Sequence, residues 1–297
     1  MLKFLQRGKL ITALLRDRGR SRRFLISRIQ HKQQARLDAM LVGSIKPRVS
    51  AHQCDLPISI TSWMPRKDAL PLALLSMIEQ SLRPAAVHVW LCAEDQEMIE
   101  ARLRDFFAVH GVQFHETDNI GPHKKWLPLI ESGHEGPFVI ADDDTFYPSD
   151  WFGALVDEGA ERPDEIIAHR CHNMKFDAHH HLRPYADWQK GVTGQKESSH
   201  SLFAVGCGGT LIRPAAIAEE FRSRELINKL CHRADDIWLK AAYIHSGYKV
   251  RKSSYDFPSL DYPGTTQSGL AVTNVDQGQN DQQLQQVLQY FDLKLAS

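Results

Sequence analysis

The chain lacks several features that would assign it to a specialised class. Its five cysteines are scattered and odd in number, and none forms a Cys-x-x-Cys pair. A chain of 297 residues can bury a core without disulfides, so this cysteine usage predicts a reducing cytosol. No apolar run approaches the length of a membrane span, and the N-terminus has no apolar stretch or cleavage site typical of a signal peptide. The length suits one large α/β domain with an appendage.

The formal net charge of zero conceals a strong asymmetry. Residues 1–40 contain eleven Lys and Arg against two Asp, a charge of +9, so the remainder must carry −9. Leu, Ile and Phe recur at helical spacing within this basic segment. The pattern favours either an interfacial helix on an anionic membrane or a helix packed on the main domain or a second subunit. Nucleic-acid binding is disfavoured, because few aromatics interleave the basic residues and the rest is acidic.

Apolar runs and helical periodicities alternate along the rest of the chain. We divide it into a basic helical extension with a linker at 1–48 and a main domain at 49–297. The alternation predicts a doubly wound, mostly parallel sheet flanked by helices. The expected strands are 56–63, 86–92, 112–116, the run before Asp142, 166–170, 203–212 and 249–252, and the expected helices are 68–82, 94–110, 123–132, 149–160, 233–246 and 281–292. We expect residues 172–200, which are polar and His-rich, to form a loop.

The most informative segment is Pro137-Phe-Val-Ile-Ala-Asp-Asp-Asp-Thr-Phe-Tyr-Pro148. It reads as a buried strand that opens into three consecutive acids at its carboxyl end, where α/β sheets bind ligands. Adjacent carboxylates repel one another unless a cation neutralises them. Mg²⁺ or Mn²⁺ would suit, because these ions take carboxylate oxygens and share them with substrate phosphates. The alternative is a solvated turn in which an Asp caps the next helix, although capping needs only one acid.

This segment resembles the DxD motif of GT-A-fold glycosyltransferases, in the style of the bacterial family 2-like enzymes that build surface polysaccharides. The resemblance covers roughly residues 55–285, and its motifs occur in the family's order. The other segments that carry it are Ile58-Ser-Ile-Thr-Ser-Trp63, Gly121-Pro-His-Lys-Lys125, Gly206-Cys-Gly-Gly-Thr210, Ala234-Asp-Asp-Ile-Trp238 and Asn280-Asp281.

The resemblance implies a metal-dependent enzyme that moves a sugar from a nucleotide-sugar donor, with UDP-sugars favoured, to a glycan or lipid-linked acceptor. It assigns Asp144 to Mn²⁺ or Mg²⁺, Asp142 to the metal or the ribose, and Asp143 to the nucleotide-sugar. In such enzymes the metal bridges the two phosphates and stabilises the leaving diphosphate.

A lysine is expected to help hold the diphosphate. Lys125 follows Gly121-Pro122 near a helix start, where a cation and free N–H groups could bind phosphate. Lys124 is the alternative candidate. The non-functional interpretation is that Lys125 is an ordinary solvated surface lysine.

Polar residues after the first two strands are candidates for the nucleotide. Ser62 and Arg66 follow the first strand, and Asp95 or Glu94 follows the second, where the resemblance places a uracil- or ribose-binding acid. All of these are also ordinary polar positions for a loop.

The second acidic motif is the candidate catalytic site. The resemblance assigns Asp236 as the general base that takes the acceptor hydroxyl proton in an inverting transfer, with Asp235 binding acceptor or orienting it. Acids at a helix N-terminus also serve as caps. Gly208 and Gly209 lie in an expected strand, where glycines indicate close approach of a backbone or ligand, here the donor sugar.

Three other interpretations must be weighed: a zinc site, a nucleotidyl- or phosphotransferase, and a non-catalytic scaffold. The histidines at 169, 172 and 179–181 match no zinc spacing, so a polar acceptor loop is preferred over a metal site. A nucleotidyl- or phosphotransferase would need a Gly-rich phosphate loop, which residues 61–65 do not provide, and a non-catalytic membrane-bound scaffold would not need both acidic motifs. We expect a cytoplasmic location, with peripheral attachment to the inner face of the membrane if residues 1–40 bind lipid.

Overall fold

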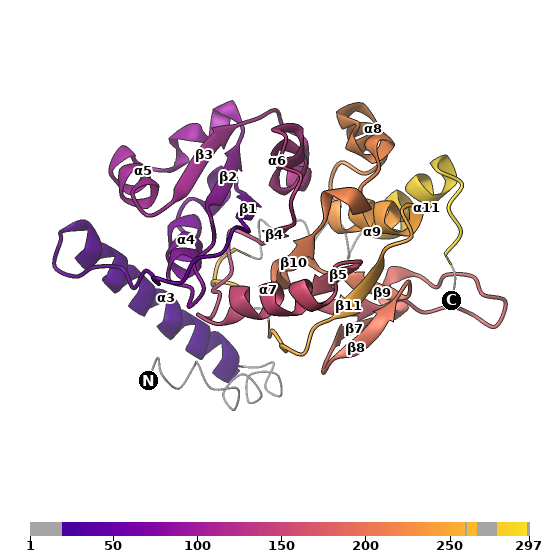
Figure 1. Cartoon of the computed structure of the whole chain (residues 1–297), viewed down its shortest axis with the longest axis horizontal. Coiled ribbons are helices and arrows are strands. Elements are labelled where there is room, and N and C mark those ends of the chain that lie inside the picture. The colour runs from indigo at the N-terminus through magenta and orange to yellow at the C-terminus, as the bar shows by residue number, and fades with distance from the viewer. Residues whose placement is uncertain (1–19, 259, 266–277, 296–297) are drawn as a thin grey trace.

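The computed structural model describes residues 20–258, 260–265 and 278–295. Its centre is an eight-stranded sheet flanked by helices (Figure 1). The strand order is β3-β2-β1-β4-β10-β5-β11-β8, and of these eight strands only β10 and β8 run opposite to the rest. The expected α/β class with a mostly parallel sheet is therefore confirmed, and the architecture is consistent with a GT-A-like fold.

The elements follow the predicted order closely in the first half of the chain. The strands are β1 Ile58–Thr61, β2 Val87–Leu91, β3 Val112–Glu116, β4 Phe138–Ile140, β5 Glu165–Ala168, β6 Cys171–Asn173, β7 Gln189–Val192, β8 Lys196–Ser199, β9 Leu202–Ala204, β10 Thr210–Ile212 and β11 Lys249–Lys252. The described α-helices are α3 Arg20–Leu41, α4 Leu70–Ile78, α5 Ala101–Ala108, α6 Leu127–Glu131, α7 Trp151–Glu161, α8 Arg224–Leu230, α9 Asp235–His245 and α11 Gln279–Tyr290.

Two hydrophobic clusters form on the two faces of the sheet. One contains side chains of α3, α4, α5 and α7, and the other contains side chains of α6, α8, α9 and α11. The first three residues of β1 are buried and the fourth, Thr61, is half-buried, as expected for a central parallel strand with helices over both faces. Because β1 pairs in parallel with both β2 and β4, the carboxyl ends of these three strands lie at one edge of the sheet.

Two expectations for the second half were wrong. Residues 172–200 are not a loop, because they contain β7, β8 and most of β6, and β6 pairs with β7 and β9 in a separate three-stranded sheet. The single strand expected at 203–212 is two strands in different sheets, with a 3-10 turn at Gly206–Gly208 between them. Gly209 has φ of 94°, a conformation that favours glycine and lets the chain change sheets there.

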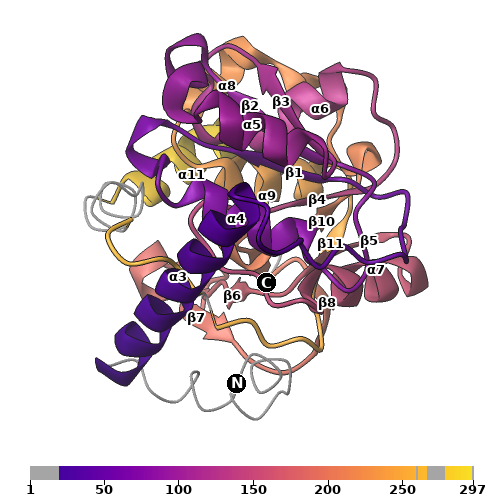
Figure 2. The same cartoon turned by 90° about the vertical axis from the view of Figure 1, so that its left-hand side faces the viewer.

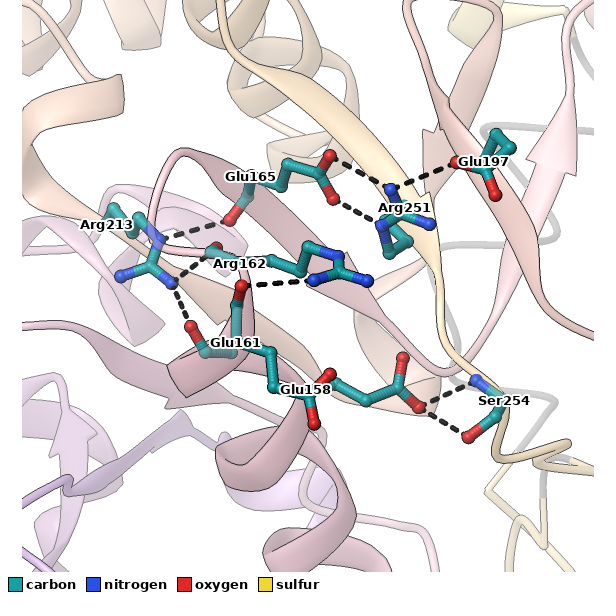
Figure 3. Close-up of polar contacts among 9 residues, drawn as sticks. Glu158, Glu161, Arg162, Glu165, Glu197, Arg213, Arg251 and Ser254 are labelled. Atoms are coloured by element: carbon teal, nitrogen blue, oxygen red, sulfur yellow. Dashed lines mark hydrogen bonds and ion pairs between the residues drawn. The ribbon is translucent and has the colours of Figure 1, made fainter.

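An ion-pair network fastens the far edge of the large sheet (Figure 3). Arg251 on β11 binds the carboxylate of Glu165 on β5 through two nitrogens, and its Nη2 lies 3.3 Å from Glu197 Oε2 on β8. Arg213 donates to backbone carbonyls of Gly159 and Glu165, at 2.7 and 3.1 Å. These contacts tie β5, β11 and β8 together away from the cleft described below.

The described part of the N-terminal extension is a helix on the outside of the domain. Figure 2 shows α3 beside α4, and α3 buries Ile26, Ile29, Leu37 and Met40 in the first hydrophobic cluster. Arg36 forms a bidentate ion pair with Glu79, with both distances at 2.6 Å. This part of the basic segment packs on the main domain, whereas residues 1–19 lie outside the described residues. Among the helices described, none combines the length and apolar character needed to cross a membrane.

Candidate active site

A cleft of about 930 Å³ opens at the carboxyl ends of β1, β2 and β4. It is the place that the topology of an α/β sheet predicts for a ligand. The cleft brings together nearly all the residues singled out in the sequence, from five separate segments. These are Ser62, Arg66, Asp95, Lys125, Asp142, Asp143, Asp144, Asp235 and Asp236.

The three acids after β4 each have a different partner. Asp142 Oδ1 accepts a hydrogen bond from Lys125 Nζ at 2.8 Å. Asp143 accepts one from the hydroxyl of Ser62, and Asp144 pairs with the guanidinium group of Arg66. The solvated-turn alternative does not fit, because Asp143 is buried and these partners come from two other segments.

The second and third acids are poorly neutralised despite these partners. Burial, followed by the charge of Asp144, raises the pKa of Asp143 to about 7. Burial, followed by the charge of Asp142, raises the pKa of Asp144 to about 6, although Arg66 opposes the shift. Carboxylates with raised pKa values favour an additional cation beside them.

The acids suit a hard divalent cation only as part of a coordination sphere. Carboxylate oxygens are ligands that Mg²⁺ and Mn²⁺ take, and Asp142 remains 31% exposed in the cleft. The ligand atoms of Asp142, Asp143 and Asp144 do not converge as a three-residue group. Within the described residues, only Cys92, Glu94 and Asp95 bring three possible ligand atoms within 4.8 Å of one another. The donor set therefore fits a metal held by one or two carboxylates plus oxygens from a ligand, and not a cage built wholly by the protein.

One buried lysine joins the two acidic motifs. Lys125 Nζ lies 2.8 Å from Asp142 Oδ1 and 3.0 Å from Asp235 Oδ2, the latter as an ion pair without hydrogen-bond geometry. Burial alone would lower the pKa of Lys125, but the carboxylates of Asp142, Asp235 and Asp236 outweigh it and hold this pKa well above the usual value. The sequence suggested that Lys125 lies at the start of an α-helix. It lies instead in a 3-10 turn, Gly121–Lys125, that precedes α6.

Lys124, the alternative candidate, has a different role. It is as buried as Lys125, but its Nζ lies 3.0 Å from the thiol of Cys92. Within the part of the chain that is described, Lys124 has no carboxylate at ion-pair distance.

Asp235 and Asp236 form the first turn of α9 but do not cap it. The N-cap position is Ala234, and no side chain caps this end of the helix. Asp236 Oδ1 instead accepts a hydrogen bond from the backbone N–H of Gly206, at 3.1 Å. Burial, together with the neighbouring charge of Asp235, holds the pKa of Asp236 well above its usual range. The capping alternative therefore does not explain these two acids.

The remaining expected residues divide between the cleft and its supports. Asp95 Oδ1 accepts a hydrogen bond from the backbone N–H of Met64 at 2.7 Å, which links the loops after β1 and β2. Gly208 and Gly209 are not among the residues that line the cleft. A Cβ at Gly208 would lie 2.4 Å from Cβ of Arg170, and one at Gly209 would lie 2.4 Å from the ring of Trp151. These two glycines are explained by packing.

The sequence analysis did not assign a role to several residues in or beside the cleft. A Cβ at Gly206 would lie 3.0 Å from Lys125 Nζ and 3.1 Å from Asp236 Oδ1, so this glycine is the one that touches the acidic site. Arg170 and Cys207 also line the cleft. Their neighbours in the sequence, a His-rich stretch and a glycine-rich stretch, gave the only signal that could have drawn attention to them.

The C-terminal Asn-Asp motif also reaches the cleft. Asn280 lines it, and Asp281 Oδ1 accepts a hydrogen bond from the backbone N–H of Tyr185 at 2.7 Å. The histidines of the same region do not gather into a metal site among the described residues. His169 is buried between Ser253 and the carbonyl of Trp151, and burial lowers its pKa to about 3.

The chain is similar to solved structures but matches no family model and no curated protein. Among solved structures, the chain is similar to residues 1–349 of S. aureus TarS in complex with UDP, at 13% identity and a TM-score of 0.42. It is also similar to the same TarS fragment described without UDP, at 12% identity and a TM-score of 0.43.

Both matches cover 66% of this chain and only 57% and 58% of the TarS fragments, which is less than two thirds of their length. A likeness at this level identifies no family. The function must come from the side chains of the cleft.

Proposed function

We propose that this chain is a glycosyltransferase that moves a sugar from a nucleotide-sugar donor to a hydroxyl group of a glycan or lipid-linked acceptor. The observation that carries the proposal is the buried Lys125, which joins the acids after β4 to the acids of α9 within one cleft. A transferase of this type needs a diphosphate site and a base for the acceptor within reach of one another.

The donor would occupy the side of the cleft formed by the loops after β1, β2 and β4. Ser62, Arg66 and Asp95 would contact the nucleoside, and Lys125 would contact the diphosphate. UDP-sugars remain the favoured donors. Arg66 is paired with Asp144 and Lys125 with Asp142. The phosphate oxygens of a donor would compete with these carboxylates for the two cations.

A divalent cation would be held by Asp144 and Asp142 together with the donor's phosphates. Bound Mn²⁺ or Mg²⁺ would neutralise charge that develops on the leaving diphosphate. Asp143 would support this site through its hydrogen bond with Ser62. The raised pKa values of Asp143 and Asp144 support an additional cation here.

In an inverting course, Asp236 would act as the general base. The acceptor oxygen forms a bond to the anomeric carbon, the bond from that carbon to the diphosphate oxygen breaks, and the hydroxyl proton passes to the Asp236 carboxylate. The Gly206 N–H holds one oxygen of Asp236 in place, and Asp235 lies beside it, paired with Lys125.

Donor binding tests this assignment directly. Calorimetric titration with UDP should show tight binding in Mn²⁺ and much weaker binding in EDTA for the natural chain. Asp144→Ala should abolish the metal-dependent part while melting temperature shows that the fold persists. Equal UDP affinity of Asp144→Ala and the natural chain, with and without EDTA, would contradict the role given to Asp144.

A role in polysaccharide synthesis at the cytoplasmic face of a membrane belongs to the same proposal. The outer face of α3 exposes Arg23, Arg28 and Lys32 around Phe24, whose side chain is 65% exposed. Each basic residue near an anionic leaflet contributes about 1 kcal/mol of attraction. A triple change of these three residues to Gln should reduce flotation with anionic vesicles and not with neutral ones. Equal flotation of both proteins would remove this face as the attachment site.

A further inference from the structure

A second, smaller pocket lies beside the cleft and is lined mainly by basic side chains. Its volume is about 210 Å³, and its basic residues are Arg22 of α3, Arg170 between β5 and β6, Lys190 of β7 and Lys252 of β11. Asp256 is the one acid among its described lining residues. Arg170 lines both this pocket and the main cleft, so the two hollows meet at its side chain.

The acid of the lining, Asp256, is itself already paired. Lys252 Nζ lies 3.1 Å from Asp256 Oδ1, and the same carboxylate accepts a hydrogen bond from the Gly194 N–H at 2.8 Å. Lys190 Nζ donates to the carbonyl of Tyr185 at 2.5 Å, and in the described chain it has no carboxylate at ion-pair distance. Burial lowers the pKa of Lys190 to about 8, against the attraction of Asp281. Among the described lining residues, four Arg and Lys side chains thus stand against one acid.

Arg170 is the strongest sign of a missing ligand. Its Nε is buried and makes no hydrogen bond, and its side chain forms no ion pair within the described residues. A buried donor without a partner costs free energy that a bound acceptor would recover. Gly208 packs closely on Cβ of Arg170, so position 208 has no room for a larger residue. This contact holds the Cβ of Arg170 in place.

The size of the pocket limits what it can hold. Small-molecule sites usually measure about 300–1,000 Å³, so this pocket fits one functional group of a larger ligand. Guanidinium and ammonium groups that approach from several elements match the several oxygens of a phosphate group. Arg170 lines the cleft together with Asp236, Tyr185 and Cys207.

We propose that this pocket binds a phosphate group of the acceptor and that Arg170 holds this group next to Asp236. The ligand's status as an acceptor rests on the proposed function, whereas phosphate binding by the pocket does not. The phosphate could be a monoester on a soluble glycan or a diester in a lipid-linked or polymeric acceptor, and both present the same oxygens.

Calorimetry on the full chain, without donor or metal, tests phosphate binding directly. The probes are glycerol 3-phosphate for the monoester, glycerophosphoglycerol for the diester, and glycerol as the neutral match. At least one phosphate probe should bind and glycerol should not, and the preferred probe indicates the source of the phosphate. Lys190→Gln and Arg170→Gln should each weaken binding about tenfold or more, as expected when a charge-assisted hydrogen bond is lost.

Two control variants separate the pocket from general charge and from the main cleft. Lys175→Gln removes an exposed lysine outside both hollows, and Lys124→Met removes a buried lysine that lines only the cleft. Both should bind the phosphate probes as the natural chain does. Binding by neither probe, or equal binding by Lys190→Gln, Arg170→Gln and the natural chain, would overturn the proposal.

The calorimetric test of phosphate binding does not depend on whether the chain turns over a donor. A chain that binds phosphate in this pocket but releases no nucleoside diphosphate from any donor would contradict the proposed function and leave the pocket standing. A chain that releases nucleoside diphosphate but fails the phosphate titration would do the reverse.

Discussion

Replacing Lys125 by Met should destabilise the fold strongly, because it would leave two carboxylates without their shared cation. The side chain of Lys125 is 6% exposed, and those of Asp142 and Asp235 are 31% and 10% exposed. Breaking a buried ion pair by removing one partner costs about 3–5 kcal/mol. Water screens the more exposed Asp142, so we expect the lower end, about 3 kcal/mol of unfolding free energy.

Lys124→Met is the matched control for this experiment. Lys124 is the adjacent residue and equally buried, but its ammonium group contacts the thiol of Cys92 and no carboxylate. Loss of one such contact, with Met filling the space of the aliphatic stem, should cost about 1 kcal/mol or less. Urea unfolding of both variants and the natural chain, followed by fluorescence, measures the difference. Equal destabilisation by the two substitutions would refute the view that Lys125 joins the acidic motifs by its charge.

Three further predictions concern other parts of the molecule. Asp236→Asn should lower turnover by about 10²–10⁴-fold with UDP affinity unchanged in calorimetry, and wild-type turnover would reject Asp236 as the base. Lys240 is 1% exposed, and burial lowers its pKa to about 7, so the folded chain binds fewer protons than the unfolded chain between about pH 7 and 10.4. Its unfolding free energy should therefore rise with pH across this window, and Lys240→Met should be more stable at pH 7 and lose that rise in urea titrations; an unchanged slope would contradict this. A chain that begins at residue 43 should melt at a lower temperature in calorimetry, because α3 buries four apolar side chains in the core, and an unchanged melting temperature would show that α3 contributes little.

The sequence predicted the cleft well where chemistry and periodicity coincided. A buried strand ending in Asp142, Asp143 and Asp144 could lie only at the carboxyl edge of the sheet, and the structure places it there. The second acidic pair, Asp235 and Asp236, was expected at a helix start and is found at one. The sequence around these residues was enough to place them, because each acidic motif directly follows a predicted strand or begins a predicted helix.

Long-range contacts were beyond the sequence. The sequence of Gly121–Lys125 does not show which of its two lysines reaches the acids. The side chains of Lys124 and Lys125 point in different directions, one to the thiol of Cys92 and the other to Asp142. The glycine next to the acids proved to be Gly206, whereas Gly208 supports Arg170. The strands within 172–200 were missed because β7 and β8 are short, mostly polar and largely exposed or half-buried, so no apolar run marks them. Arg170 was missed because its position at both hollows depends on segments that are far apart in the sequence.

The central claim is most directly tested by incubating the full chain with a panel of nucleotide-sugars, Mn²⁺ and a glycolipid extract as the source of acceptor. Mass spectrometry of the released nucleoside diphosphate and of the glycosylated acceptor gives the reading. We predict that one class of donor, most readily a UDP-sugar, yields both products, that EDTA stops the reaction and that added Mn²⁺ restores it. Absence of both products with every donor, or their formation at the same rate by Asp236→Asn, would contradict it.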